Sequence, residues 1–123
     1  MIEERLYTVD QANRVLPELI QLLAQLQEAV GLTTSEVARL APLAGHNGGG
    51  RWASEILTAG QRAQEHFSRL QSAGILLRDL ETGLVDFPAQ MDGQPVYLCW
   101  RLGEQTVGFW HLRDRGFSAR RPL

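Results

Sequence analysis

Hydrophobic residues near the start of the chain recur at alternating spacings of four and three residues, which is typical of a helix that packs along another helix. Thr8 and Gln11 form the pattern of a capping box before this repeat, so we expect a helix over residues 8–44. Pro17 predicts a kink or a restart within it. Gly31 permits a break, but the spacing continues past it, which favours one long helix. The repeated positions are Ala12, Leu16, Leu19, Leu23, Leu26 and Val30.

A glycine-rich stretch over residues 42–50 ends this repeat, and a second repeat of the same kind follows over residues 51–73. A phosphate-binding loop requires a strand before it and a lysine after it, whereas a helix is expected before this stretch and the chain contains no lysine. We therefore interpret the stretch as a linker, and Gly74 as the end of the second helix. Two such helices predict an antiparallel hairpin over residues 8–73. The second repeat comprises Trp52, Ile56, Ala59, Ala63, His66 or Phe67, Leu70 and Ala73.

After Gly74 the helical spacing gives way to short apolar segments separated by turn residues. Such short connections suit an antiparallel meander, since parallel strands need a crossover of about a dozen residues. We expect Pro88 to stop the second strand, and residues 113–123 to form an irregular basic tail. The expected strands cover residues 75–79, 84–87, 95–102 and 106–112.

These patterns together predict an α+β fold. A long N-terminal antiparallel helical hairpin is followed by a small three- or four-stranded antiparallel β-meander over residues 74–112. The length of 123 residues is typical of a single domain, which we expect to span residues 1–123. A hairpin of this kind leaves an apolar flank of each helix uncovered, which favours a homodimer formed through the hairpin.

The composition restricts the classes of function. The net charge of −2 and the pI near 5.9 argue against a dedicated nucleic-acid-binding protein. All 12 basic residues are arginines, so lysine nucleophiles and Schiff bases are excluded. Cys99 is the only cysteine, which excludes an internal disulfide and a metal site built from several cysteines. No apolar run approaches the ~20 residues of a membrane span, and the acidic N-terminus lacks the features of a signal peptide, so we expect a cytoplasmic protein.

The last two expected strands carry most of the reactive side chains. If the loop between them holds an even number of residues, an imidazole shares one face with aromatic rings, and a thiol shares the other with a guanidinium. His111 is then either packed in the core with a backbone carbonyl as its partner, or it forms a site with Asp86 or Glu104 that binds a divalent metal or acts as an acid or base. The two expected faces comprise Leu98, Trp100, Phe109 and His111 on one side, and Tyr97, Cys99, Arg101 and Trp110 on the other.

Two further features bear on function. Cys99 in the middle of a strand is typical of a small buried hydrophobe, and a nucleophilic role requires a neighbouring base. The basic tail, with Phe117 among its arginines, can contact an anionic ligand or a partner subunit, or dock on its own domain. No catalytic motif is present, so catalytic residues are not assigned. The candidate binding residues are Asp86, Cys99, Trp100, Arg101, Glu104, Trp110, His111 and Arg120, of which Asp86, Glu104 and His111 are the candidate metal ligands.

Short segments spread over essentially the whole chain form a recognisable set. They are TVDQAN at 8–13 with LP at 16–17, GILLRD at 74–79, ETGLVDF at 81–87, LCWRLGE at 98–104, WH at 110–111, DxGF at 114–117 and RxP at 120–122, where x is any residue. This set resembles a bacterial family known as domain of unknown function 2203, although Ala119 stands where the family more often has glycine. The resemblance implies a cytoplasmic protein with a helical hairpin and a sheet, and it implies no activity. The family's signature blocks include Asp86, Cys99, Trp100, Glu104 and His111.

The sequence therefore leaves two leading classes of function, and a nucleic-acid role through the arginine tail ranks behind both. The first is a small dimeric interaction or scaffold protein, because the long apolar helical faces need a partner. The alternative is a binding protein or an enzyme that takes a divalent metal or a small ligand on the C-terminal sheet around His111. The sequence names no substrate, cofactor or protein partner.

Overall fold

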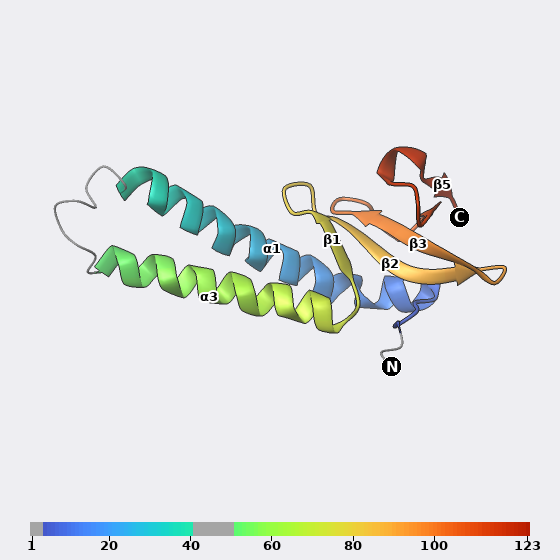
Figure 1. Cartoon of the computed structure of the whole chain (residues 1–123), viewed down its shortest axis with the longest axis horizontal. Coiled ribbons are helices and arrows are strands. Elements are labelled where there is room, and N and C mark those ends of the chain that lie inside the picture. Colours follow the sequence, from blue (N-terminus) through green and yellow to red (C-terminus); the bar gives the residue numbers. More distant parts are fainter. Residues whose placement is uncertain (1–3, 41–50) are drawn as a thin grey trace. The chain divides into compact units, whose positions relative to one another are not determined.

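The computed structural model describes residues 4–40 and 51–123. Contacts divide the chain into two units, one formed by the residues up to Gln21 together with Leu70–Leu123, and the other by Leu22–Arg69. In the described part of the chain, no helix is long and apolar enough to cross a membrane. The elements in chain order (Figure 1) are α1 (Val9–Leu40), α3 (Arg51–Ser72), β1 (Leu76–Asp79), β2 (Leu84–Met91), β3 (Gln94–Arg101), β4 (Phe109–Leu112), the 3₁₀ helix η2 (Phe117–Ala119) and β5 (Arg121–Pro122).

Helix α1 begins with the expected capping box and continues without a restart. The Thr8 N–H donates to Gln11 Oε1 at 3.0 Å, and the Gln11 N–H donates to Thr8 Oγ1 at 3.1 Å. The helix passes through both Pro17 and Gly31, so continuity is confirmed over the described residues and a restart at Pro17 is wrong. Burial of the apolar seam outweighs the cost of a proline inside a helix, which is about 3 kcal/mol. The buried seam residues are Ala12, Leu16, Leu19, Leu23, Leu26 and Ala29.

The unit of residues 22–69 is a helical hairpin, in which α1 and α3 lie side by side and run in opposite directions (Figure 1). Ala29 is buried there and Val30 is exposed, because a helix of 3.6 residues per turn drifts away from a strict 3.5-residue repeat. The same drift on α3 leaves His66 half-buried and Phe67 exposed. The expected linker over residues 42–50 lies outside the described residues.

A glycine cap ends α3 and leads directly into the sheet. Gly74 has a φ of 74°, and its N–H donates to the Gln71 carbonyl at 3.0 Å. The Ile75 N–H donates to the Leu70 carbonyl, also at 3.0 Å. This pair of bonds forms a Schellman motif, which satisfies the last carbonyls of the helix and turns the chain away from the helix axis. The helix therefore ends within one residue of the expected position.

The sheet of the described residues contains five antiparallel strands in the order β1-β2-β3-β4-β5. The antiparallel meander is therefore confirmed, and the expected count of three or four strands is too low. The additional strand comes from the tail, where Pro122 pairs with Phe109 and Arg121 pairs with Trp110. The Leu123 N–H also donates to the Gly108 carbonyl at 2.9 Å. The tail thus pairs with the sheet, and the expectation of an irregular segment is wrong at its end.

Strand β2 runs through Pro88 to Met91, so the expectation that this proline stops the strand is wrong. Among the described strands, β1 pairs only with residues 84–86 of β2 and leaves the following edge of β2 uncovered. The N–H and C=O groups of one residue in an antiparallel strand point to the same side. The Pro88 carbonyl accepts a hydrogen bond from the Tyr7 N–H at 2.7 Å on that edge, so the missing N–H of Pro88 removes no bond to β3.

The register between β3 and β4 changes the expected faces of the sheet. The loop between these strands covers residues 102–108, so it contains an odd number of residues. Tyr97 therefore lies opposite His111, and Cys99 lies opposite Phe109. As a result His111 shares a face with Cys99 and not with Trp100, which corrects the arrangement expected for an even-numbered loop.

The two faces of the sheet differ in chemistry. One face is apolar and buried, and the Tyr7 ring meets Phe87 edge-on with 5.1 Å between the ring centroids. The Val107 N–H donates to Asn13 Oδ1 at 2.7 Å, which ties the start of α1 to the loop before β4 and replaces the strand pairing expected there. The apolar face comprises Val85, Phe87, Ala89, Val96, Leu98 and Trp100, and the opposite face carries Asp86, Cys99 and His111.

Candidate metal centre

Three metal-ligating side chains meet on the polar face of the sheet. Asp86 of β2 lies directly opposite Cys99 of β3, and His111 of β4 lies opposite Tyr97, two residues before Cys99. Asp86, Cys99 and His111 are 3%, 1% and 2% exposed. A carboxylate oxygen of Asp86, the sulfur of Cys99 and a ring nitrogen of His111 all lie within 4.8 Å of one another. Within the described ranges, no other group of three His, Cys, Asp or Glu side chains converges in this way.

Hydrogen bonds orient two of these three side chains. His111 Nδ1 lies 2.8 Å from the Leu112 carbonyl, and because a carbonyl only accepts, Nδ1 carries the proton and Nε2 faces the cluster. His111 Nε2 lies 3.1 Å from Asp86 Oδ1, whereas Asp86 Oδ2 accepts a bond from Arg78 Nε at 2.9 Å. An ionised carboxylate also only accepts, so the contact between Nε2 and Oδ1 is favourable when a proton or a metal ion is shared between them.

Cys99 is a thiol in this environment and is not arranged as a nucleophile. Burial and, after it, the charge of Asp86 raise the pKa of the Cys99 thiol to about 11, while Arg120 acts in the opposite direction. A histidine that activates a thiol needs one ring nitrogen free to take the proton, and both nitrogens of His111 already face oxygen atoms. A metal ion can displace the thiol proton, since cysteine binds metals as the thiolate.

Arg78 belongs to this cluster although the sequence does not identify it, and a β-bulge places it there. The register between β1 and β2 shifts between Leu77 and Asp79, so Arg78 is the extra residue on its strand. Such a bulge re-aims the side chain, and here the guanidinium reaches Asp86 and lies 5.1 Å from the centre of the Tyr97 ring. The sequence gives no signal for a bulge at this point apart from an arginine within an apolar strand.

A pocket of about 370 Å³ lies beside the cluster. Asp86 and Cys99 both line it, so two of the three converging side chains border a space that a small molecule can enter. Leu84 of β2 and residues of β1 and of the tail form the rest of the wall. They include Arg78, Arg113, Asp114, Arg115 and Phe117.

The other candidate residues lie outside the cluster. Glu104 accepts hydrogen bonds from the two terminal nitrogens of Arg120 at 3.0 and 2.7 Å, and from the Arg101 N–H at 2.7 Å. Trp100 and Trp110 lie on the opposite face of the sheet, where the Trp100 indole N–H donates to the Glu104 carbonyl at 3.0 Å. The Glu104 carboxylate is therefore held by arginine, and it is not one of the converging ligand groups.

We expect the ion pair between Glu104 and Arg120 to contribute to the free energy of unfolding at neutral pH, and this contribution to be lost in acid. Burial alone raises the pKa of Glu104, but the hydrogen bonds and charges of Arg120 and Arg101 outweigh it, so the pKa of Glu104 lies below its usual value. A carboxyl group whose pKa is lowered by folding adds stability above its ordinary pKa, and this stability disappears as the pH falls through the folded-state pKa.

We expect Arg120→Gln to reduce the free energy of unfolding by about 1–3 kcal/mol at neutral pH, as measured by urea unfolding. At a pH low enough to protonate Glu104 in the folded state as well as in the unfolded state, the same substitution should cost much less. An equal loss at the two pH values would contradict this role of the ion pair.

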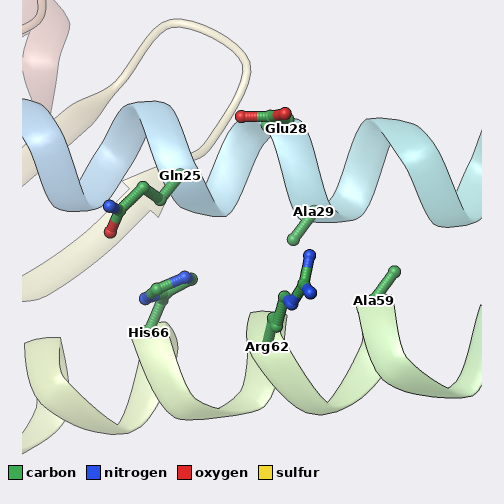
Figure 2. Close-up of a pocket in the computed structure, with 6 residues that line it drawn as sticks. All are labelled: Gln25, Glu28, Ala29, Ala59, Arg62 and His66. Atoms are coloured by element: carbon green, nitrogen blue, oxygen red, sulfur yellow. The ribbon is translucent and has the colours of Figure 1, made fainter.

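A second pocket, of about 220 Å³, lies within the helical hairpin. Figure 2 shows Arg62 and His66 of α3 directed towards α1, and Gln25 and Ala29 of α1 directed towards α3. His66 Nδ1 is buried and has no hydrogen-bond partner in the described part of the chain. His66 belongs to no converging group of three ligands among these residues, so we interpret it as a half-buried residue of the helix seam.

Comparison with known proteins identifies a family. No curated protein and no solved structure matches the chain. The family described as an uncharacterized conserved protein (DUF2203) matches residues 5–123. The matched range includes α1, α3 and the whole sheet, with Asp86, Cys99 and His111. The chain therefore belongs to the domain of unknown function 2203 family.

Proposed function

We propose that the protein binds one divalent metal ion of the zinc class between Asp86, Cys99 and His111. The observation that carries this proposal is the convergence of three buried side chains, each of a type that ligates metals, to within 4.8 Å. Burial of a carboxylate, an imidazole and a thiol together is costly unless their polar atoms are satisfied, and a metal ion satisfies all three at once.

The donor atoms favour zinc over harder ions. One nitrogen, one sulfur and one oxygen donor suit a borderline ion such as Zn²⁺, whereas Mg²⁺ and Ca²⁺ take oxygen donors. Tetrahedral bonds of about 2.0–2.3 Å separate neighbouring donor atoms by about 3.3–3.8 Å. His111 Nε2 and Asp86 Oδ1 are 3.1 Å apart, slightly closer than this range. The largest separation among the three donor atoms is at most 4.8 Å, a limit slightly wider than this range. Small side-chain rotations are therefore enough to form the site.

The contacts around the cluster support the same assignment. Metal-ligating histidines usually donate their other ring N–H to a carbonyl or a carboxylate, as His111 does to the Leu112 carbonyl. Ligating carboxylates are hydrogen-bonded in turn, as Asp86 Oδ2 is to Arg78. These contacts leave His111 Nε2 and Asp86 Oδ1 to ligate the ion.

Three protein ligands leave the fourth position of a tetrahedral ion to water or to a ligand. Structural zinc sites are closed by four protein ligands, whereas sites that bind or transform small molecules keep this position open. Asp86 and Cys99 border the pocket, so the ion is accessible to a small molecule. Such an ion attracts and polarises an oxygen atom of that molecule. We infer that the centre serves ligand binding or catalysis and not the fold alone.

The metal content of the purified full chain tests this proposal. After it is loaded with ZnCl₂ and desalted, each chain should retain about one zinc ion by elemental analysis. Loading with Co²⁺ should produce a thiolate-to-cobalt charge-transfer absorption, which reports ligation by Cys99 directly. Retention far below one ion per chain, or a cobalt spectrum without this absorption, would overturn the proposal.

Matched variants separate ligation from folding. His111→Ala and Cys99→Ser should each lose the bound ion, whereas His66→Ala, which removes a histidine of the hairpin, and Glu104→Gln should keep it. Circular dichroism of the helical signal shows whether each variant folds. If folded His111→Ala retains zinc and the cobalt charge-transfer absorption of the wild type, the assignment of His111 as a ligand is wrong.

The interaction role expected from the helical faces stays a prediction. Val30, Leu57 and Phe67 are exposed on the hairpin, and Leu57 is the most exposed of the three at 63%. If the hairpin forms the predicted homodimer, exposed apolar side chains of this kind would pack against the second copy of the chain. They belong to residues 22–69, and the proposed metal centre belongs to the other unit, so the two roles do not compete for the same residues.

A further inference from the structure

The pocket beside the proposed metal centre carries an excess of positive charge. Three arginines line it, against the two acids Asp86 and Asp114, and of these arginines Arg113 is paired with Glu4. A divalent ion ligated by Asp86 and by the Cys99 thiolate is neutral as a group, so Asp86 then no longer balances Arg78 in full. The charges that face the pocket therefore favour an anion.

Arg115 is the arginine that remains available to a ligand. The terminal nitrogens of Arg113 donate to both carboxylate oxygens of Glu4, and Arg113 Nε donates to the Val96 carbonyl at 3.3 Å. Arg78 is held by its bond to Asp86. The side chain of Arg115 makes no hydrogen bond and no ion pair with any residue that the structure describes, although it lines the pocket.

We propose that this pocket binds a small molecule with an oxyanion group, a carboxylate or a phosphate, whose oxygen takes the open position of the metal ion while Arg115 contacts the same group. This inference rests on the proposed metal site. The planar guanidinium matches carboxylate and phosphate oxygens, and a zinc-class ion binds anionic oxygen. The centre of the Phe117 ring lies 4.3 Å from the guanidinium carbon of Arg120, and this ring offers an apolar wall to the rest of the bound small molecule.

Anion titration of the Co²⁺-loaded full chain tests the inference. Inorganic phosphate or acetate, added at constant ionic strength, should shift the cobalt d–d absorption with a saturable midpoint and leave the thiolate charge-transfer absorption in place. Arg115→Gln should raise the midpoint on the order of fivefold, the effect of losing one partly solvated ion pair. Arg69→Gln, which removes an exposed arginine of α3, should leave the midpoint unchanged.

The outcomes distinguish the two proposals. If the Co²⁺-loaded chain lacks the charge-transfer absorption, the proposed metal site is wrong, and this inference fails with it. If the chain shows this absorption but neither anion changes its d–d absorption, the metal site stands and the oxyanion pocket is wrong. An unchanged midpoint in Arg115→Gln overturns the contact with Arg115. A lower midpoint for one of the two anions supports the inference and identifies the group that the pocket prefers.

Discussion

Replacing Trp100 by alanine is expected to lower the free energy of unfolding of the metal-free protein by about 3–5 kcal/mol. The indole ring is fully buried on the apolar face of the sheet, so its truncation leaves a cavity and removes the hydrogen bond to the Glu104 carbonyl. The number of zinc ions bound per chain should not change, because Asp86, Cys99 and His111 lie on the opposite face.

Urea unfolding followed by circular dichroism, in the presence of a chelator, measures the loss. The chelator is needed because an ion that binds only the folded chain adds stability by mass action. Trp100→Phe keeps most of the ring volume and should cost about 1–2 kcal/mol, which provides a variant that folds if the alanine variant does not. Loss of zinc from folded Trp100→Phe would contradict the assignment of the two faces.

The helical half of the fold can be predicted from the sequence because its signals are local. The capping box of Thr8 and Gln11 and the glycine cap at Gly74 each depend on a few neighbouring residues, and both are confirmed. The penalty of Pro17 is local as well, but the burial that outweighs it is a tertiary effect that no local pattern reports.

The strands can be predicted in kind, but their limits and register cannot. Pro88 is compatible with β2 because none of the described strands pairs with that edge at this residue, where the Pro88 carbonyl instead meets Tyr7, which is distant in sequence. The length of one loop decides the faces: an even-numbered loop separates His111 from Cys99, and the odd-numbered loop of the structure brings them together.

The members of the candidate site can therefore be named from the sequence, but they cannot be grouped. Asp86, Cys99 and His111 are all candidates by residue type, yet the sequence pairs His111 with Glu104 as readily as with Asp86. What separates Glu104 from the cluster is its ion pair with Arg120, which forms because the tail returns to the sheet as β5. That return is a long-range contact without a local signal.

Arg78→Gln is expected to weaken zinc binding by about 10–100-fold while leaving one zinc ion per chain at saturation. The bond from Arg78 Nε to Asp86 Oδ2 holds the carboxylate so that Oδ1 faces His111. Arg78→Lys should bind zinc with intermediate affinity, since lysine restores the charge but not the planar donor. Competition with a chromophoric chelator measures the affinity, and Arg69→Gln on α3 is the matched control.

The direction of this effect depends on which of two opposing contributions is larger. A guanidinium beside a divalent ion repels it, and removal of Arg78 would by that contribution alone tighten zinc binding. Asp86 and the Cys99 thiolate, however, cancel the charge of the ion, and the Arg78 side chain is 43% exposed, so solvent screens the remaining repulsion. The lost orientation of the carboxylate therefore outweighs the lost repulsion. Tighter zinc binding by Arg78→Gln than by the wild type would show instead that Arg78 acts through its charge and not by positioning Asp86.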